Sequence, residues 1–141
     1  MHLTELIPGS LYQCDAEISV CATLQSRGYA RLTLIDLCGI AADKIPSSSD
    51  LTYIRWPIED GPVPHRPTLV AIERLGANVI ESGGTVITMC SMGLNRSGLM
   101  SALILTRVRS MRGREALAFV RSKNANALRN DEFVGYLEEE R

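Results

Sequence analysis

Short hydrophobic runs alternate with longer amphipathic segments along the first two-thirds of the chain. Residues 31–37, 51–56 and 85–89 are rich in aliphatic or β-branched side chains, which predicts strands. Segments 15–27 and 68–81 carry apolar residues three or four positions apart and are closely followed by glycine, which predicts helices. Strands that alternate with helices in this way favour an α/β fold with a largely parallel sheet.

The last third of the chain is predicted to be helical. Residues 96–108, 114–122 and 131–140 have apolar positions at helical spacing and few helix breakers, and we expect Asn130 or Asp131 to cap the last helix. These helices are expected to pack on the sheet. The predicted fold is therefore a single α/β domain with a central, mostly parallel twisted sheet flanked by helices.

A proline-rich segment, residues 57–67, separates a predicted strand from a predicted helix. It contains four of the six prolines in the chain. Proline lacks an N–H and restricts the residue before it, so this segment cannot form a helix or a central strand. We expect a semi-rigid loop that displays the carboxylates of Glu59 and Asp60.

Composition argues against several classes of partner. The 141 residues carry a net charge of −1, so the chain has no overall attraction to nucleic acid or to an anionic membrane surface. No apolar run approaches the roughly 20 residues that span a bilayer. The first residues lack the basic start and long apolar core of a signal peptide, so none is expected.

The four cysteines, Cys14, Cys21, Cys38 and Cys90, are scattered without CxxC or Cys/His spacing. This pattern argues against a zinc site and against a disulfide framework, so we expect no metal, no cofactor and a reducing cytoplasm. Three of the cysteines are expected to be small buried hydrophobic residues. In a second possible role for one of them, Cys38 could resolve an oxidised Cys90 as a disulfide.

The segment M-C-S-M-G-L-N-R-S-G, residues 89–98, links a predicted strand to a predicted helix. Backbone N–H groups of such a loop converge on an anion, and the positive end of the following helix favours negative charge, including a cysteine thiolate. Gly93 lets the backbone curl, and Arg96 can grip two oxygens of a phosphoryl group. Ser97 can donate a hydrogen bond to the sulfur of Cys90. These residue types predict a phosphoryl-binding loop with a nucleophile.

Residues 90–97 resemble the signature H-C-x-x-G-x-x-R-[ST] of the cysteine-dependent protein tyrosine phosphatases, and most closely that of the compact dual-specificity branch. The resemblance continues through L-I-P-G-S-L-Y (6–12), L-I-D-L-C (34–38), W-P-I-E-D-G-P-V-P (56–64) and N-A-L-R-N-D-E-F (126–133), in the family's order. It spans most of the chain. It implies one phosphatase-like catalytic domain over residues 1–141.

The resemblance also implies a role for each matched residue. Cys90 would form a cysteinyl-phosphate, and Asp60 would protonate the leaving oxygen and then activate water, with Glu59 as the competing acid. Ser97 would stabilise the sulfur as it leaves. Phosphate binding would fall to Ser91, Met92, Gly93, Leu94, Asn95 and Arg96. No metal is needed, because Arg96 and the loop N–H groups supply the positive potential.

Met89 departs from the signature, since the family usually has histidine there. By resemblance, that histidine helps to hold the loop and to activate the thiolate, but it does not contact the transferred phosphoryl group. We therefore expect an active enzyme with a less activated nucleophile than is usual in the family.

The expected activity is hydrolysis of phosphotyrosine on protein, and whether phosphoserine and phosphothreonine are also accepted stays open. The loop G-L-N-R-S-G (93–98) also resembles that of the family's RNA 5′-phosphatases, but the net charge and 5% aromatic content do not favour RNA. Three further hypotheses stay open: a lipid phosphatase, a sulfurtransferase or arsenate reductase, and a non-catalytic pseudophosphatase. The expected partner is a phosphorylated protein, whereas the oligomeric state is not predicted.

Overall fold

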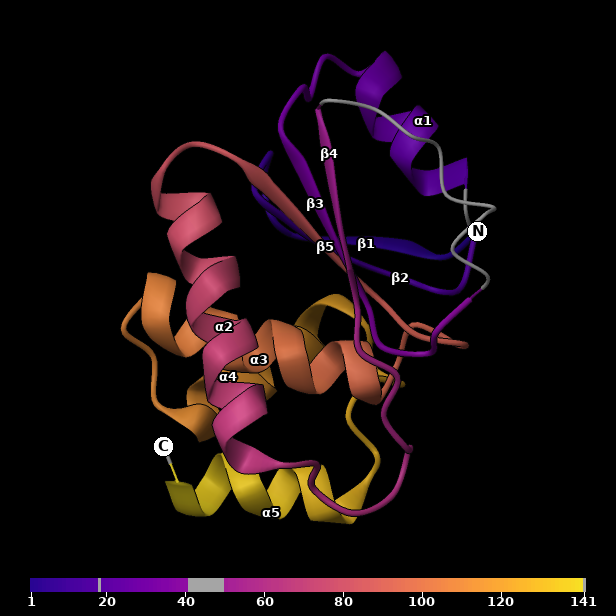
Figure 1. Ribbon diagram of the computed structural model, residues 1–141. Coiled ribbons are helices and arrows are strands. Elements are labelled where there is room, and N and C mark those ends of the chain that lie inside the picture. Colours follow the sequence, from indigo (N-terminus) through magenta and orange to yellow (C-terminus); the bar gives the residue numbers. More distant parts are fainter. Residues whose placement is uncertain (18, 41–49, 141) are drawn as a thin grey trace.

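A mixed five-stranded sheet in the order β1-β2-β5-β3-β4 organises the fold (Figure 1). The structure is a computed structural model that describes residues 1–17, 19–40 and 50–140. Strands β2, β5, β3 and β4 are parallel, and β1 joins the edge antiparallel to β2. The predicted α/β fold with a mostly parallel sheet is therefore confirmed. The strands are β1 (Leu3–Ile7), β2 (Leu11–Cys14), β3 (Leu32–Asp36), β4 (Leu51–Arg55) and β5 (Thr85–Met89).

Five helices in the described part of the chain cover the two faces of the sheet unequally (Figure 1). Helix α1 packs on one face, around Val20 and Leu24, in a cluster that also contains Met89. The other four helices form the larger layer on the opposite face, where most of the hydrophobic core lies. The helices are α1 (Ser19–Ser26), α2 (Arg66–Glu81), α3 (Arg96–Val108), α4 (Gly113–Lys123) and α5 (Asp131–Glu140).

Strand β5 and helix α3 begin and end at the predicted residues. Helix α2 begins two residues earlier than predicted, because Pro67 lies in its first turn, where a missing N–H costs nothing. Asn130 is the cap of α5, since its Oδ1 accepts from the N–H groups of Glu132 and Phe133 at 2.9 and 3.2 Å.

The hydrophobic pattern did not predict β1 and β2. They are short, the turn between them contains Pro8, and all four residues of β2 are buried, so β2 lacks an alternating pattern. Leu75 is one of the apolar residues from which the helix over 68–81 was predicted, and we expected these residues to face the core; for Leu75 this was wrong, because it is 41% exposed. Gly76 faces the core instead, and a Cβ there would lie 2.6 Å from Cδ1 of Ile104, so α2 and α3 approach closely.

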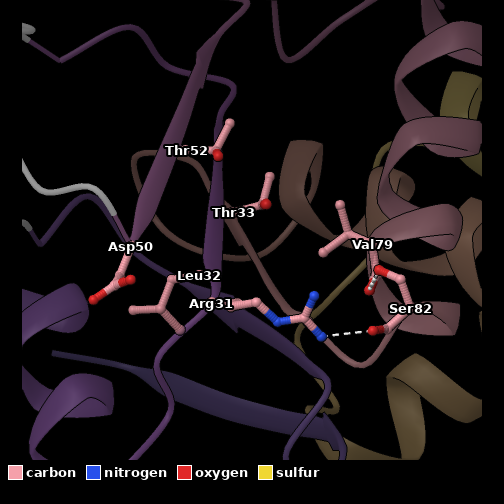
Figure 2. A pocket seen from close by; sticks show the side chains of 8 residues that line it. Arg31, Leu32, Thr33, Asp50, Thr52, Val79 and Ser82 are labelled. Atoms are coloured by element: carbon pink, nitrogen blue, oxygen red, sulfur yellow. Dashed lines mark hydrogen bonds between the residues drawn. The ribbon is translucent and has the colours of Figure 1, made fainter.

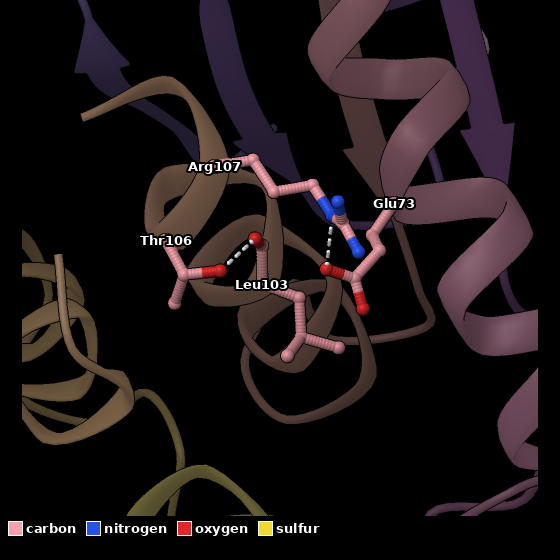
Figure 3. A network of polar contacts seen from close by, with 4 residues as sticks. All are labelled: Glu73, Leu103, Thr106 and Arg107. Carbon is pink, nitrogen blue, oxygen red and sulfur yellow. Dashed lines mark hydrogen bonds and ion pairs between the residues drawn. The ribbon is translucent and has the colours of Figure 1, made fainter. Parts of the chain in front are cut away.

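An ion pair joins these two helices within the layer (Figure 3). Nε of Arg107, in the last turn of α3, lies 2.7 Å from Oε2 of Glu73 on α2. The Glu73 side chain is fully buried and that of Arg107 is 29% exposed. A buried carboxylate is tolerated only with such a partner, so the pair fixes how α2 packs against α3.

Candidate active site

The loop that follows β5 is shaped by contacts with the neighbouring strand β2. The N–H of Cys90 donates to the carbonyl of Cys14 at 3.2 Å, and Nε2 of Gln13 donates to the carbonyl of Gly93 at 2.6 Å. Gly93 has a φ of +68°, and a Cβ there would lie 2.6 Å from the backbone nitrogen of Asp15. Only glycine therefore fits where the loop curls against β2.

Cys90 lies at the carboxyl end of β5, and its side chain meets the first turn of α3. The residue is 2% exposed. Its Sγ accepts from the N–H of Ser97 at 3.4 Å and lies 3.2 Å from the Ser97 Oγ. The N-terminal end of a helix and a hydroxyl therefore both face the sulfur. Both stabilise a negatively charged sulfur.

The guanidinium of Arg96 is held at two of its three nitrogens. Nη1 donates to the carbonyl of Ile58 at 3.0 Å, and Nη2 donates to Oγ of Ser91 at 3.0 Å. The buried Nε has no hydrogen-bond partner among the described residues. A buried donor is normally satisfied, but the buried Nε of Arg121 is unpartnered in the same way, so the unpartnered N–H alone does not identify a ligand. The acceptor that suits a guanidinium beside Cys90 is an anionic oxygen. A phosphoryl oxygen is such an acceptor.

Asp60 is connected directly to the loop of Cys90. Its Oδ2 accepts from Nδ2 of Asn95 at 3.0 Å, and its Oδ1 accepts from Nδ2 of Asn130 at 2.8 Å. Glu59 instead lines a hollow of about 260 Å³ formed by its own proline-rich segment, with Trp56 and Val63. Of the two candidate acids, Asp60 is thus the one that the structure joins to the loop.

The other predicted phosphate-binding residues lie around this centre with different side-chain roles. The Met92 side chain is 69% exposed at the outer edge of the loop, and the carbonyl of Leu94 accepts from the N–H of Leu128 at 3.3 Å. The Asn95 side chain turns away from Cys90, because its Oδ1 accepts from the N–H groups of Arg129 and Asn130. Asn95 can therefore offer phosphate its backbone, while its side chain holds neighbouring segments.

Sequence reasoning did not assign Gln13 or Asn130 to the site. Gln13 is buried in β2 and supports the loop at Gly93, and its Oε1 has no partner among the described residues. Asn130 was expected only as a helix cap. A signal was present, since Asn130 belongs to the segment 126–133 that resembles the phosphatase family, but its contact with Asp60 spans 70 positions of the chain.

Met89 is fully buried and packs on the α1 face of the sheet with Cys14 and Val20. Cys90, one position along the strand, belongs to the cluster on the opposite face. Successive side chains of a strand point to opposite faces, so the residue before Cys90 faces the core beneath α1. A methionine fits this apolar environment. The departure from the signature therefore has a packing reason.

Cys38 follows β3 and donates its S–H to Oδ1 of Asp36 at 3.2 Å. Burial, and then the hydrogen bond with Asp36, raise the pKa of the Cys38 thiol to about 11. The buried Asp36 also accepts from Tyr53 and from the backbone of residues 38–40. A thiol in this state is a weak nucleophile near neutral pH, which does not favour a resolving role toward Cys90.

Solved structures with the same architecture include several phosphatases. The chain superposes on DUSP15 with a TM-score of 0.80 and 22% identity, covering 97% of this chain and 85% of that one. It superposes on the human tyrosine phosphatase-like serine/threonine/tyrosine-interacting protein with a TM-score of 0.76 and 24% identity, covering 98% and 94%. For Tk-PTP in the active form the TM-score is 0.72, at 24% identity and with 99% and 97% covered.

No protein-family model matches the sequence, and a search of the curated proteins finds no match either. At identities of this size the superpositions establish architecture rather than chemistry. The resemblance seen in the sequence is confirmed at that level: this chain has the fold of the compact dual-specificity phosphatases.

Proposed function

We propose that this chain is a phosphatase of the cysteine-dependent protein tyrosine phosphatase superfamily, in its compact dual-specificity branch. It would hydrolyse phosphate monoesters on protein through a cysteinyl-phosphate. One observation carries the proposal: Cys90, facing Ser97 at the start of α3, shares a loop with Arg96, whose buried Nε lacks an acceptor among the described residues. The connection of Asp60 to that loop through Asn95 adds a proton donor.

In the first step the Cys90 thiolate attacks phosphorus, so that an S–P bond forms as the P–O bond to the substrate breaks. Asp60, protonated, gives its proton to the departing oxygen. The charge that develops on the equatorial oxygens meets the Arg96 guanidinium and the N–H groups of residues 91–96. A proton donor of this kind contributes a factor of roughly 10²–10⁴ when the leaving group is poor.

In the second step water attacks the cysteinyl-phosphate. Asp60, now ionised, takes a proton from that water, the S–P bond breaks, and inorganic phosphate is released. The sulfur leaves with the electron pair of the bond, and the hydroxyl of Ser97, 3.2 Å from Sγ, can donate a hydrogen bond to it. The enzyme returns to its starting state with the proton back on Asp60.

The surroundings of Asp60 support a protein substrate over a polyanionic one. A hollow of about 310 Å³ beside it is lined by the acidic Asp131 and Glu132, with Arg129 as the basic residue. The exposed thioether of Met92 adds an apolar contact at the loop. Repeated phosphates of RNA or of a phosphoinositide would meet net negative charge here, whereas a phosphotyrosine side chain on a peptide brings one phosphate and an apolar ring.

The proposed location is a reducing cytoplasm, and all four cysteines are free thiols in the structure, which agrees with it. Among the residues that the structure describes, no helix has the length and apolar character needed to span a bilayer. The proposed partner is a phosphorylated protein or peptide.

The test is hydrolysis of p-nitrophenyl phosphate and of a phosphotyrosine peptide by the wild-type protein and by Cys90→Ser, with 5′-triphosphorylated RNA and a phosphoinositide as competing substrates. We expect turnover of the aryl phosphate and the peptide, its loss in Cys90→Ser, and a covalent link between labelled phosphate and Cys90 after rapid quenching. Equal rates for the two proteins would overturn the assignment. Tight phosphopeptide binding without turnover would indicate a pseudophosphatase, and preference for RNA or lipid would replace the substrate class.

A further inference from the structure

Two asparagine side chains bind the proline-rich segment to the rest of the site. Asn95 belongs to the loop after Cys90, and Asn130 lies just before α5. Between them they donate an amide N–H to each carboxylate oxygen of Asp60, at 3.0 and 2.8 Å. Three segments far apart in the sequence therefore meet at one carboxylate.

Asn130 is itself held at both ends of its amide. Its Oδ1 caps α5 by accepting from Glu132 and Phe133, while its Nδ2 donates to Oδ1 of Asp60 and to the carbonyl of Gly61 at 3.0 Å. The Nδ2 group cannot swing away from Asp60 unless the cap is lost. The side chain therefore transmits the position of α5 to the carboxylate.

Asn95 fixes the same region from the other side. Its Oδ1 accepts from the N–H groups of Arg129 and Asn130 at 2.7 and 3.1 Å, so the backbone before α5 is tied to the loop of Cys90. This places Asn130, and through it Asp60, in a fixed relation to the nucleophile. A side chain that is locked by its own hydrogen bonds can hold a reacting group in place.

The proline-rich segment needs such outside support. Its anchor on the sheet is at Ile58, whose N–H donates to the carbonyl of Leu37 at 3.0 Å and whose carbonyl accepts from Arg96. Pro62 and Pro64, beyond Asp60, have no N–H to donate. The carboxylate of Asp60 lies between Ile58 and these prolines. In the proposed reaction this carboxylate must reach the oxygen of the leaving group.

We propose that Asn130 is the positioning residue that holds Asp60 for proton transfer to the leaving group, with α5 as the rigid support. The inference rests on the proposed function and assigns Asn130 no contact with substrate. Its loss leaves the nucleophile and the phosphate-binding loop intact but places the proton donor poorly. The penalty should therefore grow as the leaving group becomes more basic and more dependent on protonation.

The test is Asn130→Ser, because serine caps a helix about as well as asparagine but has no amide to donate to Asp60. Asn126→Ser, an exposed position in the same connection, is the matched control. The values of kcat/KM are compared over a series of aryl phosphates whose leaving groups become more basic, from 2,4-dinitrophenyl phosphate to phenyl phosphate. We expect Asn130→Ser to lose about 30-fold on phenyl phosphate and less than about 3-fold on the dinitrophenyl ester, within the range that a general acid contributes.

A second variant, Asn130→Asp, keeps the capping oxygen but faces Asp60 with a carboxylate in place of the amide. It keeps the cap but removes the amide donor to Asp60, so it should show a leaving-group-dependent loss of the same kind as Asn130→Ser. Thermal unfolding is used to check that each variant is folded. The pH profile of Asn130→Ser should lose the limb that reports the acid.

The outcomes separate the inference from the function on which it rests. Equal losses on all esters, or rates for Asn130→Ser that match those of Asn126→Ser, overturn the positioning role while wild-type turnover stands. Wild-type protein that hydrolyses no ester, or no faster than Cys90→Ser, overturns the proposed function and the inference together. A loss of kcat/KM that grows with the basicity of the leaving group in both Asn130 variants supports the positioning role.

Discussion

The two edges of the parallel sheet carry similar types of residue, but these residues adjoin opposite ends of helices. At the amino edge, a hollow of about 310 Å³ is lined by Arg31, Asp50 and Ser82 (Figure 2). At the carboxyl edge, a hollow of about 310 Å³ lies beside Asp60 and Asn95. Each edge has an arginine, carboxylates and glycines close by, so composition does not tell them apart.

The direction of the helix at each edge makes the difference. Nη2 of Arg31 donates at 2.5 Å to the carbonyl of Ser82, at the end of α2, where helix carbonyls carry partial negative charge (Figure 2). Arg96 instead begins α3, where N–H groups carry partial positive charge, and its Nε has no partner among the described residues. The hollow at the carboxyl edge is lined by Arg129 and not by Arg96. We therefore expect Arg96 to bind an anion because of its place at the start of α3, whereas Arg31 faces the carbonyl end of α2.

The largest test of this comparison exchanges each arginine for lysine. We expect Arg96→Lys to lower kcat/KM by about 10³-fold, because lysine cannot replace a planar fork that meets two oxygens in the transition state. Arg31→Lys should stay within about 2-fold of wild type, as for other surface positions. Steady-state kinetics on an aryl phosphate measure both. Equal losses at the two positions would mean that the edges do not differ in the way proposed.

The glycines of the two edges sharpen the comparison. Gly93 and Gly83 both have positive φ, +68° and +92°. A Cβ on Gly93 would lie 2.6 Å from the backbone nitrogen of Asp15, which cannot move without shifting β2, whereas one on Gly83 would meet the flexible tip of Arg31 at 2.8 Å. We expect Gly93→Ala to lower the free energy of unfolding by about 3 kcal/mol, from strain plus overpacking.

The matched change Gly83→Ala should lower the free energy of unfolding by about 1 kcal/mol, the cost of the backbone conformation alone. Denaturant unfolding gives both values. Only Gly93→Ala should also lower turnover, since it displaces the loop that holds Cys90. A smaller stability loss for Gly93→Ala than for Gly83→Ala would contradict the close contact between the loop and β2.

Helix α3 offers the same contrast along its own length, with Arg96 at its start and Arg107 in its last turn. Arg107→Met removes the cation from the buried carboxylate of Glu73 (Figure 3). Because the Arg107 side chain is 29% exposed, the loss in the free energy of unfolding should be about 2 kcal/mol, below that of a fully buried pair. Turnover per folded molecule should not change.

The control for Arg107→Met is Arg109→Met, an exposed position for which we expect a change within about 0.5 kcal/mol. Unfolding in guanidinium and kinetics on the folded proteins separate the two effects. Lost turnover in Arg107→Met, with stability intact, would mean that the far end of α3 acts on the site.

The smallest effect concerns the thiol of Cys38 at the carboxyl edge. Burial and Asp36 raise the pKa of Cys38 to about 11, so its thiolate appears only as the pH rises toward that value. At pH 8 the Cys38 thiol is therefore almost entirely protonated. Alkylation with iodoacetamide, followed by peptide mass spectrometry, should therefore leave Cys38 unmodified at pH 8 and label it increasingly above pH 10. Rapid labelling of Cys38 at pH 7 would contradict its hydrogen bond to Asp36.

The elements around Cys90 were predictable because local signals agree there. A β-branched run, a glycine and an amphipathic segment follow one another without a gap, so β5 and α3 were placed correctly. Strands β1 and β2 were missed because four or five residues with mixed polarity carry little periodicity. Strand β2 is instead stabilised by its pairing with β5, which the local sequence does not reveal.

The candidate site was predictable in its reacting residues but not in its supports. Cys90, Arg96 and Ser97 lie within one loop, whose spacing is visible in the sequence. The contact of Asp60 with Asn130 depends on two segments that meet only in the folded chain, and a surface asparagine before a helix is ordinarily read as a cap. The burial of the Met89 side chain beneath α1 likewise depends on which face of β5 this residue occupies, and the signature alone does not give that face.

The pairing of β2 with β5 has a consequence for how the protein folds. Gln13, which supports the loop at Gly93, is separated from it by 80 positions, so the chain must close a long loop before this contact can form. The helices α2 to α5 and strand β5 can associate through shorter separations. A chain that is compact but lacks the N-terminal hairpin is therefore expected to lack the proposed phosphatase activity. During refolding, the return of turnover should lag behind the return of the helical circular dichroism signal. The lag would measure how long strands β1 and β2 take to dock.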